Sequence, residues 1–95
     1  MKVLKKATTP KGTGIQIEDW REDYSFVKTL SIGAYPIAKE SRGNWIKKNE
    51  TFRLSITDFN NDNEVYSIFN KLINGNITLK ELSKNFRNFE DINLL

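Results

Sequence analysis

Hydrophobic and polar residues alternate along much of the first sixty positions, and this period of two is typical of β-strands with one covered face. Residues 2–8 and 13–19 flank the turn-forming sequence TTPKGTG, so we expect them to pair as a hairpin. In the second of these strands the expected core positions are Ile15 and Ile17, and the expected solvated positions are Gln16 and Glu18.

Two later stretches continue the alternation. Residues 25–39 predict a third strand, which should lie at a sheet edge or end near Pro36, because proline cannot donate a hydrogen bond to a neighbouring strand. Residues 51–59 alternate most regularly and predict a fourth strand. The expected positions on one face of these two strands are Phe26, Lys28, Leu30, Ile32, Ala34, Phe52, Leu54 and Ile56, among which the lysine is a misfit.

In the C-terminal third of the chain the hydrophobic period changes to 3.6, which predicts helices. Asn61 and Glu64 form a capping box that should begin a first helix, and Gly75 should end it in a left-handed conformation. Thr78 and Glu81 form another capping box and predict a second helix. The expected buried stripes are Val65, Ile68, Phe69 and Leu72, then Leu79, Leu82 and Phe86.

These elements predict a single α+β domain over residues 1–95. An antiparallel meander of three or four strands should carry two C-terminal helices on one face. The expected core consists of Ile15, Ile17, Leu30, Ile32, Phe52, Leu54, Ile56, Val65, Ile68, Phe69, Leu72, Leu79, Leu82 and Phe86.

The composition of the chain excludes several kinds of functional site. The chain has no cysteine and no histidine, so disulfides, thiolate metal sites, the usual zinc ligands and Ser-His-Asp catalysis are excluded for these residues. No apolar run exceeds two residues, and the first residues lack the apolar stretch of a secretion signal. We therefore expect no membrane association and a cytoplasmic location, and we expect neither an enzyme nor a cofactor.

Charge is unevenly distributed between the two halves of the chain. Residues 1–48 contain ten Lys and Arg against five Asp and Glu, whereas residues 49–95 contain five against seven. Any attraction for a polyanion is therefore expected to lie in the N-terminal half.

Four acids lie at the end of the second strand and in the segment that follows it: Glu18, Asp19, Glu22 and Asp23 around Trp20. A magnesium or calcium site would need several oxygen ligands that converge, but alternate strand residues point to opposite faces. The preferred interpretation is that these acids keep a strand end soluble and discourage edge-to-edge association. Trp20 should either return to the core through a β-bulge or be exposed as an anchor for a protein partner.

The sequence SRGNWIKKNE predicts a polar bend at Gly43 and Asn44 that presents an aromatic ring among cations. The preferred interpretation is an ordinary hairpin tip whose tryptophan folds back onto the sheet. Alternatively, such a loop can stack a nucleic-acid base and hold phosphates, or it can contribute to a protein interface. The candidate partner-binding residues of the whole chain are Trp20, Tyr24, Tyr35, Arg42, Trp45, Lys47 and Lys48.

These residues support a small non-enzymatic module that binds a protein. The richness in Asn, Ile and Lys is similar to that of many bacterial phage and mobile-element proteins, which implies a protein that inhibits a host protein, such as a defence protein. The alternative hypothesis is a nucleic-acid-binding protein that uses the basic N-terminal half and the Arg42–Lys48 loop. The oligomeric state and the partner's identity are not specified by the sequence.

Overall fold

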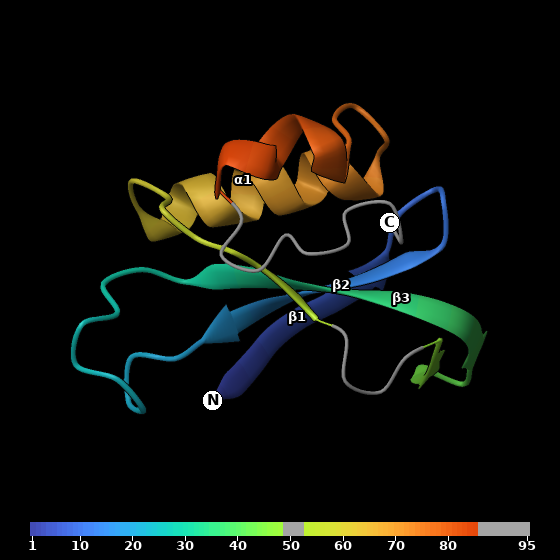
Figure 1. Cartoon of the computed structure of the whole chain (residues 1–95), viewed down its shortest axis with the longest axis horizontal. Coiled ribbons are helices and arrows are strands. Elements are labelled where there is room, and N and C mark those ends of the chain that lie inside the picture. The colour runs from blue at the N-terminus through green and yellow to red at the C-terminus, as the bar shows by residue number, and fades with distance from the viewer. Residues whose placement is uncertain (49–52, 86–95) are drawn as a thin grey trace.

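A computed structural model describes residues 1–48 and 53–85 of the chain. In this part an antiparallel meander sheet curls into a half-barrel, and one α-helix covers one of its faces (Figure 1). The elements are β1 (Lys2–Thr8), β2 (Thr13–Asp19), β3 (Ser31–Ser41), β4 (Asn44–Lys47), β5 (Leu54–Ile56), α1 (Asp62–Ile73) and the 3₁₀ segment η1 (Leu79–Asn85). None of the helices in the described ranges is long and apolar enough to cross a membrane.

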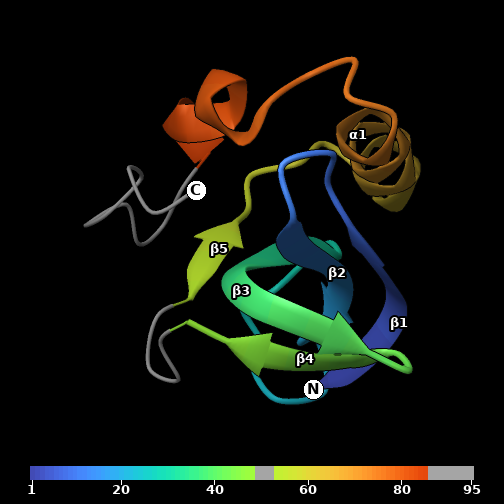
Figure 2. The same cartoon turned by 90° about the vertical axis from the view of Figure 1, so that its right-hand side faces the viewer.

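The sheet has the order β1-β2-β3-β4, and β5 pairs with the first half of β3. Register irregularities lie between Val3 and Lys5 in β1 and between Ile37 and Lys39 in β3. Such irregularities increase local twist, which curls a sheet. Figure 2 shows the result: β3 bends strongly, with β2 and β1 on one side and β4 below it.

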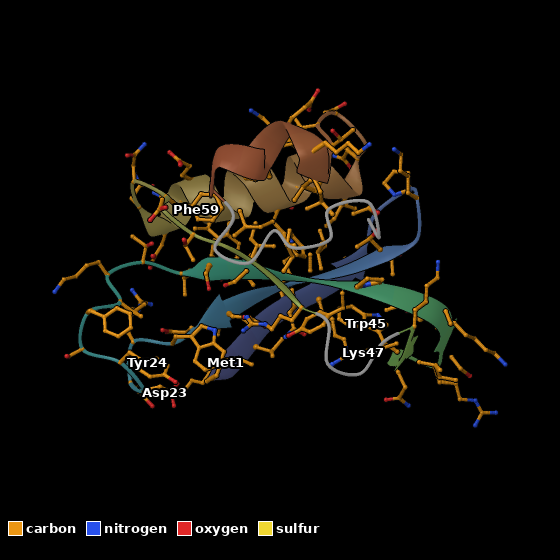
Figure 3. The ribbon with its side chains drawn as sticks, viewed as in Figure 1. Met1, Asp23, Tyr24, Trp45, Lys47 and Phe59 are labelled. Atoms are coloured by element: carbon orange, nitrogen blue, oxygen red, sulfur yellow. The ribbon has the colours of Figure 1, made fainter. Side chains whose placement is uncertain are left out.

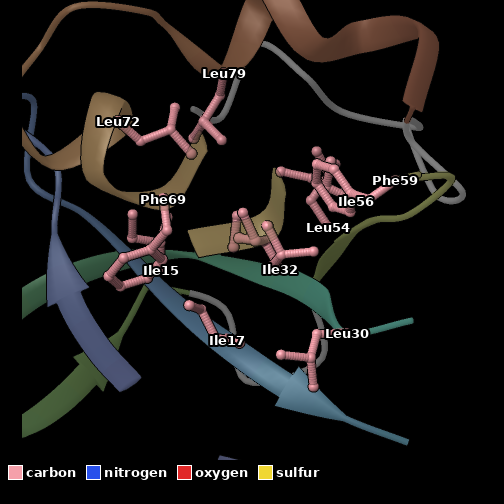
Figure 4. Close-up of a cluster of buried hydrophobic side chains, with 12 residues drawn as sticks. Ile15, Ile17, Leu30, Ile32, Leu54, Ile56, Phe59, Phe69, Leu72 and Leu79 are labelled. Carbon is pink, nitrogen blue, oxygen red and sulfur yellow. The ribbon is translucent and has the colours of Figure 1, made fainter. Parts of the chain in front are cut away.

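The core lies between the sheet and α1 (Figure 4). The expected core residues Ile15, Ile17, Leu30, Ile32, Leu54, Ile56, Val65, Phe69, Leu72 and Leu79 are buried, as are Ala34 and Phe59, while Ile68 and Leu82 are partly buried against them. Phe52 and Phe86 lie outside the described residues. Period-two and period-3.6 patterns therefore identified the residues that meet in this core.

The first predicted helix is confirmed as α1. The side chain of Asn61 accepts a hydrogen bond of 2.9 Å from the Glu64 amide, and Gly75 has a φ of +75° just beyond the C-cap. A glycine tolerates this left-handed conformation without the steric cost of a Cβ.

The second predicted α-helix is wrong, because residues 79–85 form the 3₁₀ segment η1. The capping residues are nevertheless engaged: the Thr78 amide donates to the Glu81 carboxylate at 2.8 Å. The Glu81 amide donates to the Thr78 carbonyl at 3.1 Å, which is the i to i+3 pattern of a 3₁₀ turn. A capping box specifies a helical first turn, and a 3₁₀ turn satisfies the same donors.

The third predicted strand begins later than expected. Residues 20–30 form a loop of turns, and β3 begins at Ser31 and continues through Pro36 to Ser41. Phe26 and Lys28, placed by the alternation on the inward face, are exposed on this loop. Pro36 is the last β3 residue paired with β2, so it marks where that pairing stops and not where the strand ends.

The predicted polar bend is the tip of the β3–β4 hairpin. Its turn residues are Arg42 and Gly43, with φ values of +52° and +79°, so the bend lies one residue earlier than expected. Two consecutive positive φ values are typical of the tight turns that suit the twist of a hairpin.

Candidate functional site

The sheet face opposite α1 is polar but buried, because the curl of the sheet encloses it. We call this the inner face and define it by the buried Gln16, Glu18 and Tyr35 and the half-buried Trp45. The expectation that Gln16 and Glu18 lie on a solvated face is wrong: both are buried, and Glu18 is 0% exposed. A period of two predicts which side chains share a face, but it does not predict that the face closes on itself.

Glu18 is held by four side-chain donors. The indole Nε1 of Trp20 donates to Oε1 at 3.0 Å, and the guanidinium of Arg53 forms a hydrogen-bonded ion pair with the same oxygen. Gln16 Nε2 and the Tyr35 hydroxyl donate to Oε2 at 2.5 and 3.1 Å. This carboxylate is therefore not a solubilising surface acid, since burial of a charge is tolerated when it is paired and hydrogen-bonded.

Arg53 and Tyr35 complete the network. Arg53 Nε donates to the Tyr35 hydroxyl at 3.1 Å, and its Cζ lies 5.2 Å from the centre of the Trp20 ring. Burial lowers the pKa of the Arg53 guanidinium and raises the pKa of the Tyr35 phenol from their ordinary values. Tyr35 therefore stays protonated near neutral pH and can donate its hydrogen to the carboxylate.

Gly33 leaves the space that the Glu18 carboxylate occupies. A Cβ at this position would lie 2.5 Å from Glu18 Oε2 and 2.8 Å from its Cδ. Glu18 cannot move away cheaply, because four donors hold it.

Replacing Gly33 with alanine is therefore expected to lower the free energy of unfolding by about 1–3 kcal/mol, the usual cost of overpacking. Urea denaturation of the wild type and the variant measures this difference. Gly12, whose added Cβ would meet nothing within 4 Å but whose φ is +83°, offers a glycine control for backbone strain alone. A Gly33 variant as stable as the wild type would contradict the tight packing of the carboxylate.

Trp45 fills one end of the inner face. Its ring centre is 5.9 Å from that of Tyr35, and the ammonium of Lys6 lies 4.1 Å from the centre of the indole. A Cβ on Gly14 would approach the same indole to 3.0 Å. The ammonium of Lys47 lies over the Tyr35 ring in the same way, 4.2 Å from the ring centre. Three of the candidate partner-binding residues, Tyr35, Trp45 and Lys47, thus pack on one another inside the curl.

The other end of the inner face opens into a pocket of about 600 Å³. We call the three rings beside it the aromatic surface: Trp20, Tyr24 and Phe26, with ring centres 5.9 Å apart for the first pair and 5.4 Å for the second. Trp20 is fixed by its hydrogen bond to Glu18, whereas Tyr24 is 48% and Phe26 75% exposed. Figure 3 shows Tyr24 at one end of the molecule and Trp45 with Lys47 toward the other.

The loop that carries these rings is tied down at both ends by Asp62, the first residue of α1. The Asp62 carboxylate accepts from Arg21 Nη1 and from the Leu30 amide, both at 3.0 Å. Arg21 also forms a two-pronged contact with Asp19, in which Nε and Nη2 each donate at 3.0 Å. The aromatic surface is therefore presented by an anchored loop.

The remaining acids of the predicted cluster are also paired on the surface. Lys2 binds Glu22 at 3.0 Å, and the N-terminal amino group lies 2.7 Å from Asp23. Among the described residues, no group of three acids is placed to hold a metal ion. These contacts give Asp19, Glu22 and Asp23 the role of ion-pair partners that shape the loop.

The Asp19–Arg21 contact predicts a specific dependence of stability on pH. The hydrogen bonds from Arg21 lower the pKa of Asp19 from 3.8 to about 2. A carboxylate with a lowered pKa in the folded state stabilises the fold above its ordinary pKa, and this contribution is lost as the pH falls toward the lowered value. We expect an Asp19→Asn variant to be less stable than the wild type at pH 7, with a difference that disappears between about pH 4 and pH 2.

Urea midpoints at pH 7, 4 and 2 check this expectation. Glu40→Gln is the matched control, because Glu40 is exposed on β3 and has no ion pair among the described residues. A difference between the Asp19 variant and the wild type that persists unchanged at pH 2 would contradict it.

The two remaining candidate residues, Arg42 and Lys48, are exposed around the β3–β4 hairpin and do not join the aromatic surface. The sequence interpretation missed Arg53 and Phe26. Arg53 could have been noticed as a cation that alternates with the core residues of its strand, as Glu18 does in its own strand. No pattern marked Phe26 as exposed.

Searches against known protein families, curated proteins and solved structures find no match to this chain.

Proposed function

We propose that this chain is a non-enzymatic binding module that engages a protein partner through the aromatic surface and the adjoining pocket. One observation carries the proposal: a row of three mutually tilted rings ends in Phe26, which is 75% exposed and lines a pocket of about 600 Å³. Exposed aromatic side chains are enriched at protein interfaces and supply much of their binding energy. The sequence composition supports a host protein as the partner and inhibition as the role.

The charges around the rings favour a protein over a nucleic acid. Asp19, Glu22 and Asp23 lie on or beside the same loop and balance the charges of Arg21, Lys2 and the N-terminal amino group, so the loop offers phosphates no excess of positive charge. On the hairpin, Trp45 is half-buried against Tyr35, so its ring is already engaged within the fold. The nucleic-acid alternative therefore rests on the exposed cations of the basic N-terminal half, which include Arg42 and Lys48.

A capture experiment distinguishes these two functions. The immobilised chain, its Phe26→Ala variant and an Arg42→Asn/Lys48→Ala variant are exposed to lysate of the native host, with and without nuclease. Asparagine is chosen at Arg42 because it tolerates the positive φ of that turn. We expect a protein that survives nuclease, is retained by the hairpin variant and is lost with Phe26→Ala.

A partner lost after nuclease treatment and with the hairpin variant would overturn the proposal in favour of nucleic-acid binding. The comparison is interpretable because Phe26 is mostly exposed, so its truncation should change stability by no more than about 0.5 kcal/mol. Thermal unfolding of the variant verifies that the fold is intact.

A further inference from the structure

We propose that the pocket receives a segment of the partner protein in which an aromatic side chain lies next to a carboxylate side chain. The inference rests on the proposed function and specifies the chemistry of the partner. The aromatic side chain would pack on the rings of Tyr24 and Phe26, and the carboxylate would reach Arg53 and Lys28.

The walls of the pocket fit an aromatic side chain. Trp20, Tyr24, Phe26 and Phe59 all line it. The Trp20–Tyr24 and Tyr24–Phe26 ring centres lie 5.9 and 5.4 Å apart, with the rings tilted by 30° and 36°. Phe26, at the end of this row, leaves most of its surface free for a further ring. Pockets of 300–1,000 Å³ are typical of small-ligand sites, so about 600 Å³ is enough for a pair of side chains.

The polar groups of the pocket fit a carboxylate. Arginine has five N–H donors. In Arg53, Nε donates to Tyr35 and Nη2 to Glu18, while Nη1 has no hydrogen-bond partner among the described residues. Lys28 adds an exposed ammonium to the lining. Asp58 also lines the pocket, but it already has an interaction of its own.

A nucleotide also combines a ring with an anion, but the pocket suits a single carboxylate better. The charge of Arg53 is already balanced by Glu18, so the site offers hydrogen-bond donors without a strong excess of positive charge. The acids of the loop beside the pocket balance Arg21, Lys2 and the N-terminal amino group, so the loop adds no excess of positive charge that would hold a phosphate chain. A protein segment with one acid needs only the hydrogen-bond donors of the pocket.

The two tryptophans allow a direct test by NMR, because Trp20 lines the pocket and Trp45 lies at the other end of the inner face. The ¹⁵N-labelled full chain is titrated with three acetylated, amidated peptides: Gly-Ser-Phe-Glu-Ser-Gly, its glutamine analogue and its alanine-for-phenylalanine analogue. A thymidine octanucleotide is the fourth probe. We expect the acidic peptide to shift the Trp20 indole signal, to leave that of Trp45 unchanged, and to bind at least about tenfold more tightly than each analogue, the factor that corresponds to about 1.4 kcal/mol.

Variants assign the two contacts separately. Phe26→Ala should weaken binding of the acidic peptide by at least about tenfold. Lys28→Gln should reduce the preference for glutamate over glutamine about threefold, as an exposed charge contributes modestly. The Glu18→Gln/Arg53→Met variant removes the buried pair together and should reduce that preference to the roughly threefold part that Lys28 supplies. Lys28→Gln tests the Lys28 contact without disturbing the pair.

Equal binding of the glutamate and glutamine peptides, or a shift of Trp45 in place of Trp20, would overturn the inference. Tighter binding of the octanucleotide than of the acidic peptide at the Trp20 signal would also overturn it. These outcomes differ from failure of the proposed function, which is shown by a Phe26→Ala variant that still captures the partner.

Discussion

Replacing Arg53 with methionine is expected to lower the free energy of unfolding by about 3–5 kcal/mol. The substitution keeps much of the side-chain length but removes the cation that pairs with Glu18. Glu18 is 0% exposed, so its charge would remain in the inner face without its ion-pair partner. Urea denaturation at pH 7 measures the loss.

The double variant Glu18→Gln/Arg53→Met is the control, because removing both charges leaves no buried charge unpaired. We expect it to be clearly more stable than Arg53→Met alone, with a coupling in the double-mutant cycle of about 1–3 kcal/mol. Strict additivity of the two single substitutions would contradict an energetically coupled pair. If Arg53→Met does not fold, recovery of folding in the double variant supports the same conclusion.

Truncating Phe69 to alanine is expected to lower the free energy of unfolding by about 3–5 kcal/mol, through the loss of hydrophobic contacts in the core. Phe69 is wholly buried at the centre of the cluster between α1 and the sheet (Figure 4). Its removal would leave a cavity that the surrounding isoleucines fill only in part. Tyr66→Ala on the exposed side of the same helix controls for the loss of an aromatic residue and should cost about 1 kcal/mol or less.

Thermal or urea unfolding of both variants checks this expectation. A domain of this size has about 5–15 kcal/mol of stability, so the Phe69 variant should be close to unfolding. Similar losses for Phe69 and Tyr66 would contradict the central position of Phe69 in the core.

The part of the fold that is set by local periodicity could be predicted from the sequence. In α1, the spacing of Val65, Phe69 and Leu72 defines the buried stripe, while Asn61 and Gly75 mark the ends. Each of these signals acts within a few residues along the chain. Ile15 and Ile17 were assigned to the core for the same reason.

The inner face could not be predicted in this way, because it depends on contacts between distant residues. Glu18 is joined to Arg53 across 35 positions, and Trp45 reaches Lys6 on β1 only because the sheet curls. Alternation assigned Glu18 to the correct face and gave no information on the closure of that face. The burial of the network is therefore a property of the whole sheet.

The loop at residues 20–30 shows how alternation can mislead. Phe26 follows the period of the true strand residues Ile32 and Ala34, yet the strand begins only at Ser31. The Leu30 amide is hydrogen-bonded to Asp62, a contact from a distant helix that fixes the loop just before the strand. Lys28 was the local sign that the strand does not extend back to residue 25, because a lysine is rarely placed in a core.

Affinity for the isolated partner, measured by calorimetry, tests the proposed binding surface most directly. The wild type, Phe26→Ala and Lys48→Ala are compared at the same salt concentration, since both side chains are exposed and lie on different loops. Binding through the aromatic surface predicts a loss of at least about 2 kcal/mol, or about thirtyfold in Kd, for Phe26→Ala. Lys48→Ala should stay within about twofold of the wild type. Wild-type affinity for Phe26→Ala, with loss of binding for Lys48→Ala, would contradict it.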